Sequence, residues 1–538
     1  MRITRTLIMV LAVCLLAAAL PLPFAAAESD PITLTIVRST DTLIENLADN
    51  ATTRMIEDNF NVKLEFMEYP SQDATAKLAV VMASGSNLPD IINMPLDYVS
   101  EYNYAMRGML VPLNDYLNDP EMTKNLDSRV DADMKEAILG TVRMPDGKNY
   151  GLPAYEDTVW GRAYNRAWIN QEWLETLGLD MPKTTDDFRD VLTAFVNGDP
   201  NGNGKKDEIG LLGSTGGYGQ NLVPFLLNAF TYADPDSNYF AVKDGNIIAA
   251  FMLDEFRDGL EYIRGLVADG LIYAGSFTQD QTQMRSIINQ DGDYVVGCVT
   301  AGSAGHWTGV SSNPNLRKMT LLEPLTGPGG ECNTPTAEPS ANNCWYVTSA
   351  CEHPDVAFSI GESFYDFETS MTQRYGVKEK DWTTDPEKMN DYFFEYGQFG
   401  YDRIFAVVND AAWTEANNIN WRNSTPKIFD NALDMSWAIE LLENYESGAT
   451  LVFRPDHYER YVPHMADEVI GKLNYTAEEA ETIADISTSI NSYVKEAITA
   501  FITGNRSLDE WDNYLTTLEN MDLQTYIATM QEAYNRKK

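Results

Sequence analysis

Near its N-terminus the chain carries three short apolar segments: ITLTIV at residues 32–37, VKLEF at 62–66 and LPDII at 88–92. The first two alternate apolar and polar residues, which is typical of strands. Helical patterns fill residues 41–60 and 73–82, and Gly85 follows the second as a C-cap. This order of strands and helices predicts an open α/β domain with a largely parallel sheet.

The residues that follow these strands are the first candidates for ligand contact. In open parallel sheets, ligands bind beyond the carboxyl ends of the strands. Arg38 to Asp41 follow the first strand, and Met94 to Tyr98 follow the third. We therefore expect Arg38 and Asp41 to face a ligand.

A second α/β block begins after a hairpin-like crossover at Gly147–Pro153. A strand is expected near residues 161–165, helices near 170–177 and after Thr184, and a late strand at 294–299. Beyond Pro324 a Gly/Pro/Ser-rich passage indicates a return between lobes.

The C-terminal region has helical patterns. Thr476 with Glu479, and Ser507 with Glu510, have the spacing of capping boxes. Apolar residues recur three and four positions apart after each of them, so two amphipathic helices are expected here.

Composition limits the functions that the chain can have. It has 538 residues, with 80 acidic and 39 basic side chains and a net charge of −41. This excess of acid argues against nucleic acid and against anionic membrane surfaces as partners. Hydrophobic residues make up 44%, which excludes a mostly disordered chain.

The first 27 residues have the layout of a signal peptide. Arg2 and Arg5 precede an apolar run at residues 7–20, and Ala25-Ala26-Ala27 is suited to cleavage. The run is too short to span a bilayer as a membrane anchor. We expect an extracytoplasmic protein, secreted or associated with the cell surface.

Cysteines leave two questions open. Cys14 ends a lipobox-like Leu-Ala-Val-Cys, although Val13 stands where a small residue is usual, so a lipid anchor stays an alternative. An exported protein can oxidise its thiols, and the remaining cysteines allow three pairings: Cys298, Cys332, Cys344 and Cys351.

One loop has the pattern of a calcium site. In the segment DPNGNGKKDE at residues 199–208, short oxygen-bearing side chains occupy alternate positions and Gly204 permits a sharp turn. The candidate ligands are Asp199, Asn201, Asn203, Lys205 through its carbonyl, Asp207 and Glu208. Gly210 stands where the twelfth-position Glu of an EF-hand loop would be, and Glu208 could supply that carboxylate. A structural Ca²⁺ is expected, with a plain Asn-Gly surface turn as the alternative.

Aromatic side chains near predicted loops are candidates for stacking on sugar rings. Tyr155, Glu156 and Trp160 directly follow the crossover, and Trp307 and Trp345 lie near lobe junctions. Sugars present apolar C–H faces that suit aromatic platforms, although large aromatics also fill cores. The chain has no phosphate-binding loop, HExxH or GxSxG motif that would mark an enzyme.

Several segments together resemble the extracellular solute-binding proteins of ABC importers, family 1, in the large branch that binds oligosaccharides. The segments are Met82–Gly85 with Leu88–Ile92, Gly147–Pro153, Trp173–Leu179 with Pro182–Thr185, and Phe501–Gly504 with Trp511–Tyr514. The resemblance implies two α/β lobes with a ligand cleft between them and a helical C-terminal region. The loop at 199–208 also looks like the calcium loop of alginate-binding members.

From this resemblance we expect the following division: signal peptide 1–27, first lobe 28–152 and 323–400, second lobe 153–322 and 401–538. The expected function is to capture an oligosaccharide and deliver it, as a monomer, to the permease subunits of an ABC importer. A receptor for a peptide or other polar solute is one alternative. A secreted polysaccharide-active enzyme is another, and it would need a pair of cleft carboxylates.

Overall fold

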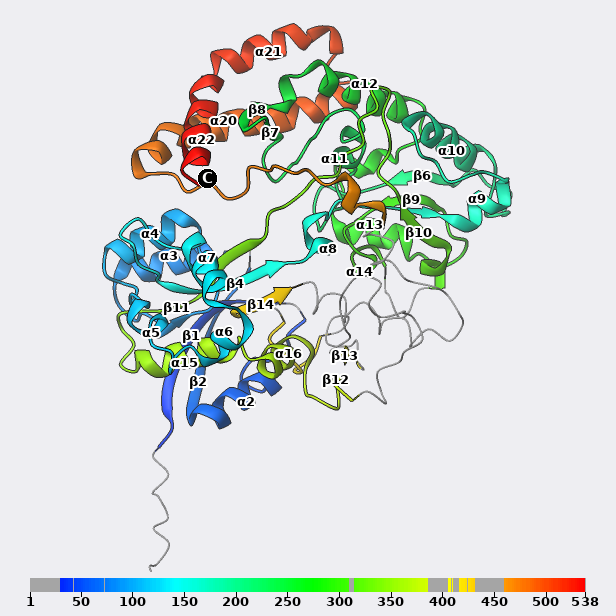
Figure 1. The fold of residues 1–538 in the computed structure, drawn as a ribbon. Helices are drawn as coiled ribbons and strands as arrows, with labels where there is room; N and C mark the ends of the chain where they lie inside the picture. Colours follow the sequence, from blue (N-terminus) through cyan, green and yellow to red (C-terminus); the bar gives the residue numbers. More distant parts are fainter. Residues whose placement is uncertain are drawn as a thin grey trace, which may run out of the picture.

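The computed structural model describes residues 30–385, 405–407, 409, 416–430 and 459–537, apart from Thr42, Gln72, residues 309–313 and Asn423. The predicted signal peptide and Cys14 lie outside these residues. Figure 1 shows two lobes, each with its own sheet, joined by extended segments that cross between them.

The first lobe contains a six-stranded sheet in the order β14-β4-β11-β3-β1-β2. Only β11 runs antiparallel to its neighbours. The strands are β1 (Ile32–Ser39), β2 (Val62–Tyr69), β3 (Ile91–Ile92), β4 (Gly151–Asp157), β11 (Ser340–Val347) and β14 (Lys427–Asp430). Its helices are α2 (Ala51–Phe60), α3 (Ala74–Ser84), α4 (Tyr98–Met106), α5 (Asn114–Leu117), α6 (Lys124–Arg129), α7 (Ala132–Thr141), α15 (Pro354–Ser363) and α16 (Phe367–Tyr375). A two-stranded sheet pairs β12 (Trp382–Thr383) with β13 (Ala406–Val407).

The second lobe contains a four-stranded sheet in the order β10-β5-β9-β6. Its strands are β5 (Ala167–Asn170), β6 (Ile209–Leu212), β9 (Val296–Thr300) and β10 (Met319–Leu322), and a hairpin is formed by β7 (Phe240–Lys243) and β8 (Asn246–Ala249). Its helices are α8 (Val159–Arg162), α9 (Gln171–Leu177), α10 (Thr185–Asn197), α11 (Leu222–Leu227), α12 (Asp254–Ala268), α13 (Gln281–Ile288) and α14 (Ala304–Trp307).

The C-terminal helices pack on the second lobe. They are α20 (Ala477–Ile502), α21 (Trp511–Asn520) and α22 (Leu523–Lys537), and their apolar faces share one core with α10, α11 and α12. Thr476 and Glu479 form the predicted capping box. Ser507 instead caps a short 3-10 turn, and α21 begins only at Trp511. The two-lobe α/β fold with a helical C-terminal region is thus confirmed.

The crossing segments make two sheet edges face each other. Residues 158–166 lead from the end of β4 to the start of β5, and residues 323–339 return from β10 to β11. The strands β1, β3, β4 and β14 all end at the edge where β4 leaves. Ala167, the first residue of β5, pairs with Thr300, the last of β9, so β5 begins at the edge where β9 and β6 end. Loops from both edges therefore lie on the side of each sheet from which the crossing segments run.

Three expected elements differ in the structure. The first helix begins at Ala51 rather than near Asp41, because Asn50 caps it and the preceding residues form polar turns. The strand expected at 161–165 lies at Ala167–Asn170, after the short helix α8. Residues 427–430, which the division assigned to the second lobe, form β14 and pair with β4 in the first. The rest of the division stays a prediction.

Candidate ligand-binding region between the lobes

Arg38 lies at the end of β1 and is buried beneath a segment that returns from far along the chain. Its guanidinium lies 5.1 Å from the centroid of the Trp421 ring, and Nη2 donates to Ser424 Oγ at 2.6 Å. Burial lowers the pKa of Arg38 to about 10. Arg38 therefore holds Trp421 and Ser424 at the sheet edge, which is a supporting position beneath the surface.

Asp41 lies on the loop that follows β1. Its Oδ1 accepts a hydrogen bond from the Leu43 amide at 2.8 Å, and its Oδ2 lies 3.5 Å from Arg422 Nε. The carboxylate is half-buried, so it remains partly open to solvent.

Tyr155 and Glu156 lie at the end of β4, beside β14. Lys427 Nζ donates to Glu156 Oε2 at 3.0 Å, and the lysine side chain is only 6% exposed whereas the glutamate is 40% exposed. Burial lowers the pKa of Lys427. Tyr155 is half-buried, with its hydroxyl 3.5 Å from Asp157 Oδ2. This pair of strand ends offers an oriented carboxylate and a phenol.

The three candidate tryptophans are buried. Trp160 in α8 is 8% exposed, and the Arg166 guanidinium lies 3.6 Å from its ring centroid. Trp345 is fully buried, packs on Phe364 and donates its indole N–H to the Ala357 carbonyl at 3.0 Å. Trp307 is fully buried against Trp168. Trp345 and Trp307 are core residues, because each packs within a buried hydrophobic cluster of its own lobe.

The second lobe contributes an aromatic cluster that the sequence analysis missed. Tyr218 lies between Tyr164 and His306, with ring centroids 6.0 and 5.1 Å away. Ser303 Oγ lies 2.6 Å from His306 Nδ1. Burial, with the charges of Arg285 and Arg166, lowers the pKa of His306 to about 4, so this ring is neutral at pH 7. We call Tyr164, Tyr218 and His306 the aromatic platform.

Glycine-rich loops hold the platform in place. Tyr218 follows β6 in the segment GSTGGYGQ at 213–220, and His306 follows β9. A Cβ on Gly302 would lie 2.2 Å from the Tyr218 ring, so only glycine allows this close approach. A strand followed by a glycine-rich turn is the signal that could have identified the loop.

A cavity of about 840 Å³ lies between the lobes, within the range of about 300–1,000 Å³ typical of ligand pockets. Its walls come from both lobes, from the second crossing segment and from the C-terminal helix, and include Asp97, Tyr98, Asp234, Glu338, Lys472 and Arg536. Asp97 and Tyr98 belong to the loop predicted to follow the third strand. None of the seven predicted ligand-binding residues lines it.

Asp234 links this cavity to the aromatic platform. The buried carboxylate accepts from the Tyr164 hydroxyl at 3.3 Å, the Ser237 hydroxyl at 2.9 Å and the Asp236 amide at 3.1 Å. Burial, reinforced by the charge of Asp236, raises its pKa to about 6.

The loop at 199–208 forms a tight turn after α10. Gly204 N–H donates to Asp199 Oδ2 at 3.1 Å, Lys205 N–H donates to Asn203 Oδ1 at 2.8 Å, and Asn203 Nδ2 donates to Asp207 Oδ1 at 3.2 Å. Among the described residues, no three His, Cys, Asp or Glu side chains converge as a metal site. The loop relies partly on asparagine oxygens, which are suitable calcium ligands.

Glu208 indicates that a cation would fit here. Its Oε1 is buried and has no hydrogen-bond partner. Burial raises the pKa of Glu208, and the charges of Asp207 and Asp199 add to this. An unpaired carboxylate beside two others is compensated when a cation binds among them. The donor set therefore fits Ca²⁺.

A family model described as bacterial extracellular solute-binding protein matches residues 45–359. The chain belongs to this family. The Streptococcus pneumoniae fructooligosaccharide ABC transporter substrate-binding protein FusA is 27% identical over 500 residues, which cover 89% of this chain and 86% of that protein. The Bacillus subtilis polygalacturonan/rhamnogalacturonan-binding protein YtcQ is 25% identical over 51% of each chain.

Solved structures of solute-binding proteins share the fold. The structure of FusA with kestose has a TM-score of 0.73 at 25% identity and covers 94% of this chain and 99% of that one. An HMO-binding, ABC-transporter-associated solute-binding protein from Bifidobacterium longum infantis has a TM-score of 0.70 at 19% identity and covers 94% of this chain and 99% of that one. Because the chain belongs to a family of binding proteins, the alternative of a polysaccharide-active enzyme is disfavoured.

The extracytoplasmic location expected for this solute-binding protein agrees with its family. In the part of the chain that the structure describes, no helix is long and apolar enough to cross a membrane. The four cysteines described, Cys298, Cys332, Cys344 and Cys351, are free thiols, three of them buried.

Proposed function

We propose that this solute-binding protein captures an oligosaccharide between its two lobes and delivers it to the permease subunits of an ABC importer. The observation that carries the proposal is the pairing of two sheet edges. One presents the aromatic platform, and the other presents oriented carboxylates with their basic partners. Sugar rings need both kinds of group, because they have apolar faces and hydroxyl rims.

The proposed contacts follow from exposure. Asp41, Tyr155 and Glu156 are partly open at the first edge, and Tyr164 and Tyr218 are partly open at the second. Arg38 and Trp160 support these loops from beneath. Trp307 and Trp345 are left out, because their side chains lie in the cores.

Similarity to FusA and YtcQ supports a glycan as the ligand, since FusA is named for fructooligosaccharide and YtcQ for polygalacturonan and rhamnogalacturonan. A peptide or other polar solute is the second candidate, and the charged walls of the interlobe cavity are the observation in its favour.

The proposal is tested by thermal unfolding of the mature protein with kestose, trigalacturonate, maltotriose and a tripeptide. Ligand that binds the folded state raises the midpoint by mass action. We expect one glycan class to raise it and to be recovered intact. A response to the tripeptide alone would contradict the glycan proposal, and cleaved glycan would contradict a binding role.

We further propose that Ca²⁺ binds at Asp199, Asn201, Asn203, Asp207 and Glu208, with the Lys205 carbonyl, and stabilises the second lobe. A FusA structure described as an EF-hand mutant supports such a site in a similar protein.

We also propose that residues 1–27 direct export. Mass spectrometry of the cell-surface protein would identify its first residue and any lipid on Cys14.

A further inference from the structure

Arg166 occupies a buried position between the first crossing segment and the aromatic platform. Its side chain is fully buried, just before β5. The guanidinium lies over the Trp160 ring at 3.6 Å from the centroid, and Nη2 donates to the Trp160 carbonyl. Nη1 donates to the Gly302 carbonyl. One side chain thus joins α8, in the crossing, to the loop that follows β9.

That loop is bonded directly to the platform. Gly302 N–H donates to the Tyr218 carbonyl at 2.8 Å, and Ala301 N–H donates to the Arg166 carbonyl at 2.9 Å. The Tyr218 ring packs against Gly302, where a Cβ would lie 2.2 Å from it. A shift of Tyr218 on ligand contact would therefore displace Gly302, whose carbonyl accepts a hydrogen bond from Arg166.

The other end of this connection reaches both crossing segments. Arg162 Nε in α8 donates to the Ala337 carbonyl at 3.1 Å, and Ala337 N–H donates to the Arg162 carbonyl at 2.9 Å. Helix α8 is thus bonded to residues 323–339 as well as being part of 158–166. These are the segments that must bend if the lobes close, since they join the two sheets.

We propose that Arg166 is a positioning residue that couples ligand contact on the aromatic platform to the bending of the crossing segments. The coupling needs arginine, because its planar fork donates to two carbonyls while its face stacks on an indole. A lysine keeps the charge but cannot make all three contacts. The inference rests on the proposed function, which supplies the ligand.

The test compares Arg166→Lys with a matched control, Arg506→Lys. Arg506 also stacks on an aromatic ring, 4.9 Å from Phe501, and donates to Tyr493, but it lies among the C-terminal helices. Titration calorimetry with kestose, trigalacturonate and maltotriose gives Kd. Small-angle scattering at saturating ligand gives the closed fraction, and thermal unfolding without ligand gives stability.

We expect Arg166→Lys to raise Kd about tenfold and to lower the closed fraction, whereas Arg506→Lys lowers the unfolding midpoint and leaves Kd within twofold. Trp160→Leu removes the other half of the stack and is expected to give the same loss. In the double variant the two losses should not add, because both break one connection.

The outcomes separate the two proposals. If the wild-type protein binds none of kestose, trigalacturonate and maltotriose, the proposed function and this inference fall together. If it binds one of these three glycans and Arg166→Lys keeps the wild-type Kd and closed fraction, the inference alone is overturned. Independent, additive losses in the double variant would also overturn it, because they would show two separate structural effects.

Discussion

At the scale of single residues, Tyr218 is the side chain on which the proposed glycan contact depends most. It lies between Tyr164 and His306, and its loop is held by Gly302. Tyr218→Ala is expected to weaken glycan binding by about 1–1.5 kcal/mol, or about tenfold, through lost stacking. Calorimetry with the glycan that binds the wild type measures this. Tyr273→Ala removes an exposed tyrosine of the same lobe and should leave Kd unchanged. If both variants change Kd equally, the aromatic platform is not the glycan contact.

Asp234 gives a prediction about pH. Its pKa of about 6 in the folded protein lies above the value of about 3.9 for an unfolded chain. The folded state therefore binds the proton more tightly, and the free energy of unfolding falls as pH rises from about 4 to 6. Asp234→Asn lacks this loss, so its stability relative to wild type should increase over that range, by at most about 3 kcal/mol. Urea unfolding at pH 4, 5, 6 and 7 measures the difference, and parallel curves would refute it.

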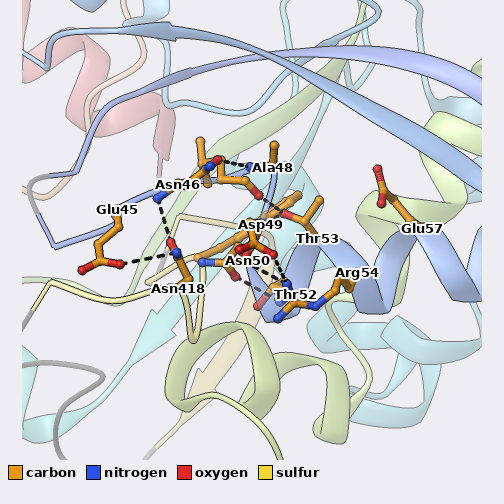
Figure 2. Close-up of polar contacts among 12 residues, drawn as sticks. Glu45, Asn46, Ala48, Asp49, Asn50, Thr52, Thr53, Arg54, Glu57 and Asn418 are labelled. Atoms are coloured by element: carbon orange, nitrogen blue, oxygen red, sulfur yellow. Dashed lines mark hydrogen bonds and ion pairs between the residues drawn. The ribbon is translucent and has the colours of Figure 1, made fainter.

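At the scale of elements, the loop between β1 and α2 is joined to residues 417–420, which lie far away in the sequence (Figure 2). Asn46 N–H donates to Asn418 Oδ1 at 2.7 Å, and Asn418 Nδ2 reaches Glu45 Oε2 at 3.4 Å. Asn50 caps α2 through the Thr52 amide at 3.0 Å and donates to the Asn420 carbonyl at 2.7 Å. These hydrogen bonds therefore hold the start of α2 against the segment that leads into β14.

Asn50→Ala removes both the cap and the tie to Asn420. The expected loss of unfolding free energy is about 2–3 kcal/mol, because a helix cap is worth about 1 and a buried carbonyl is left without its donor. Asn46→Ala, at an exposed turn, should cost under about 1 kcal/mol. Urea unfolding monitored by circular dichroism gives both values, and an equal loss in the two variants would contradict the role assigned to Asn50.

The calcium loop gives the second prediction at this scale. Without calcium, Glu208 is a buried carboxylate with a raised pKa, so its contribution to the free energy of unfolding falls as pH rises through that pKa. In chelator at pH 7, Glu208→Gln should therefore unfold at a higher temperature than wild type. With excess Ca²⁺ the order should reverse, because the variant loses a ligand. Scanning calorimetry would show this crossover, and the same order in both buffers would exclude Glu208 as a ligand.

The sequence predicted the elements whose signals are local. The strands β1 to β3, the helix that begins after Thr184 and the capping box of Thr476 with Glu479 depend on neighbours within a few residues. Strand β14 could not be assigned, because its place beside β4 depends on pairing Ile428 with Tyr155 from far away. Tyr218 was missed because a glycine-rich segment resembles an ordinary turn. Trp345 was a candidate with a core position as the alternative, and the structure buries it fully, because an aromatic residue near a predicted junction does not reveal which way it points.

At the scale of the whole molecule, two sheets with facing edges are joined by segments 158–166 and 323–339 (Figure 1). Such a pair of lobes binds ligand by closing around it, and ligand shifts the population only by its preference for the closed form. Residues of both lobes line the charged cavity, so a motion of one lobe relative to the other would change it. The affinity for ligand and the fraction of closed molecules therefore depend on each other.

The most direct test of this account is small-angle X-ray scattering of the mature protein titrated with the glycan that raises its unfolding midpoint. Capture between closing lobes predicts a decrease in the radius of gyration that saturates with the same Kd as calorimetry, with the glycan recovered unchanged. A radius of gyration that stays constant while the glycan binds stoichiometrically would contradict capture between closing lobes.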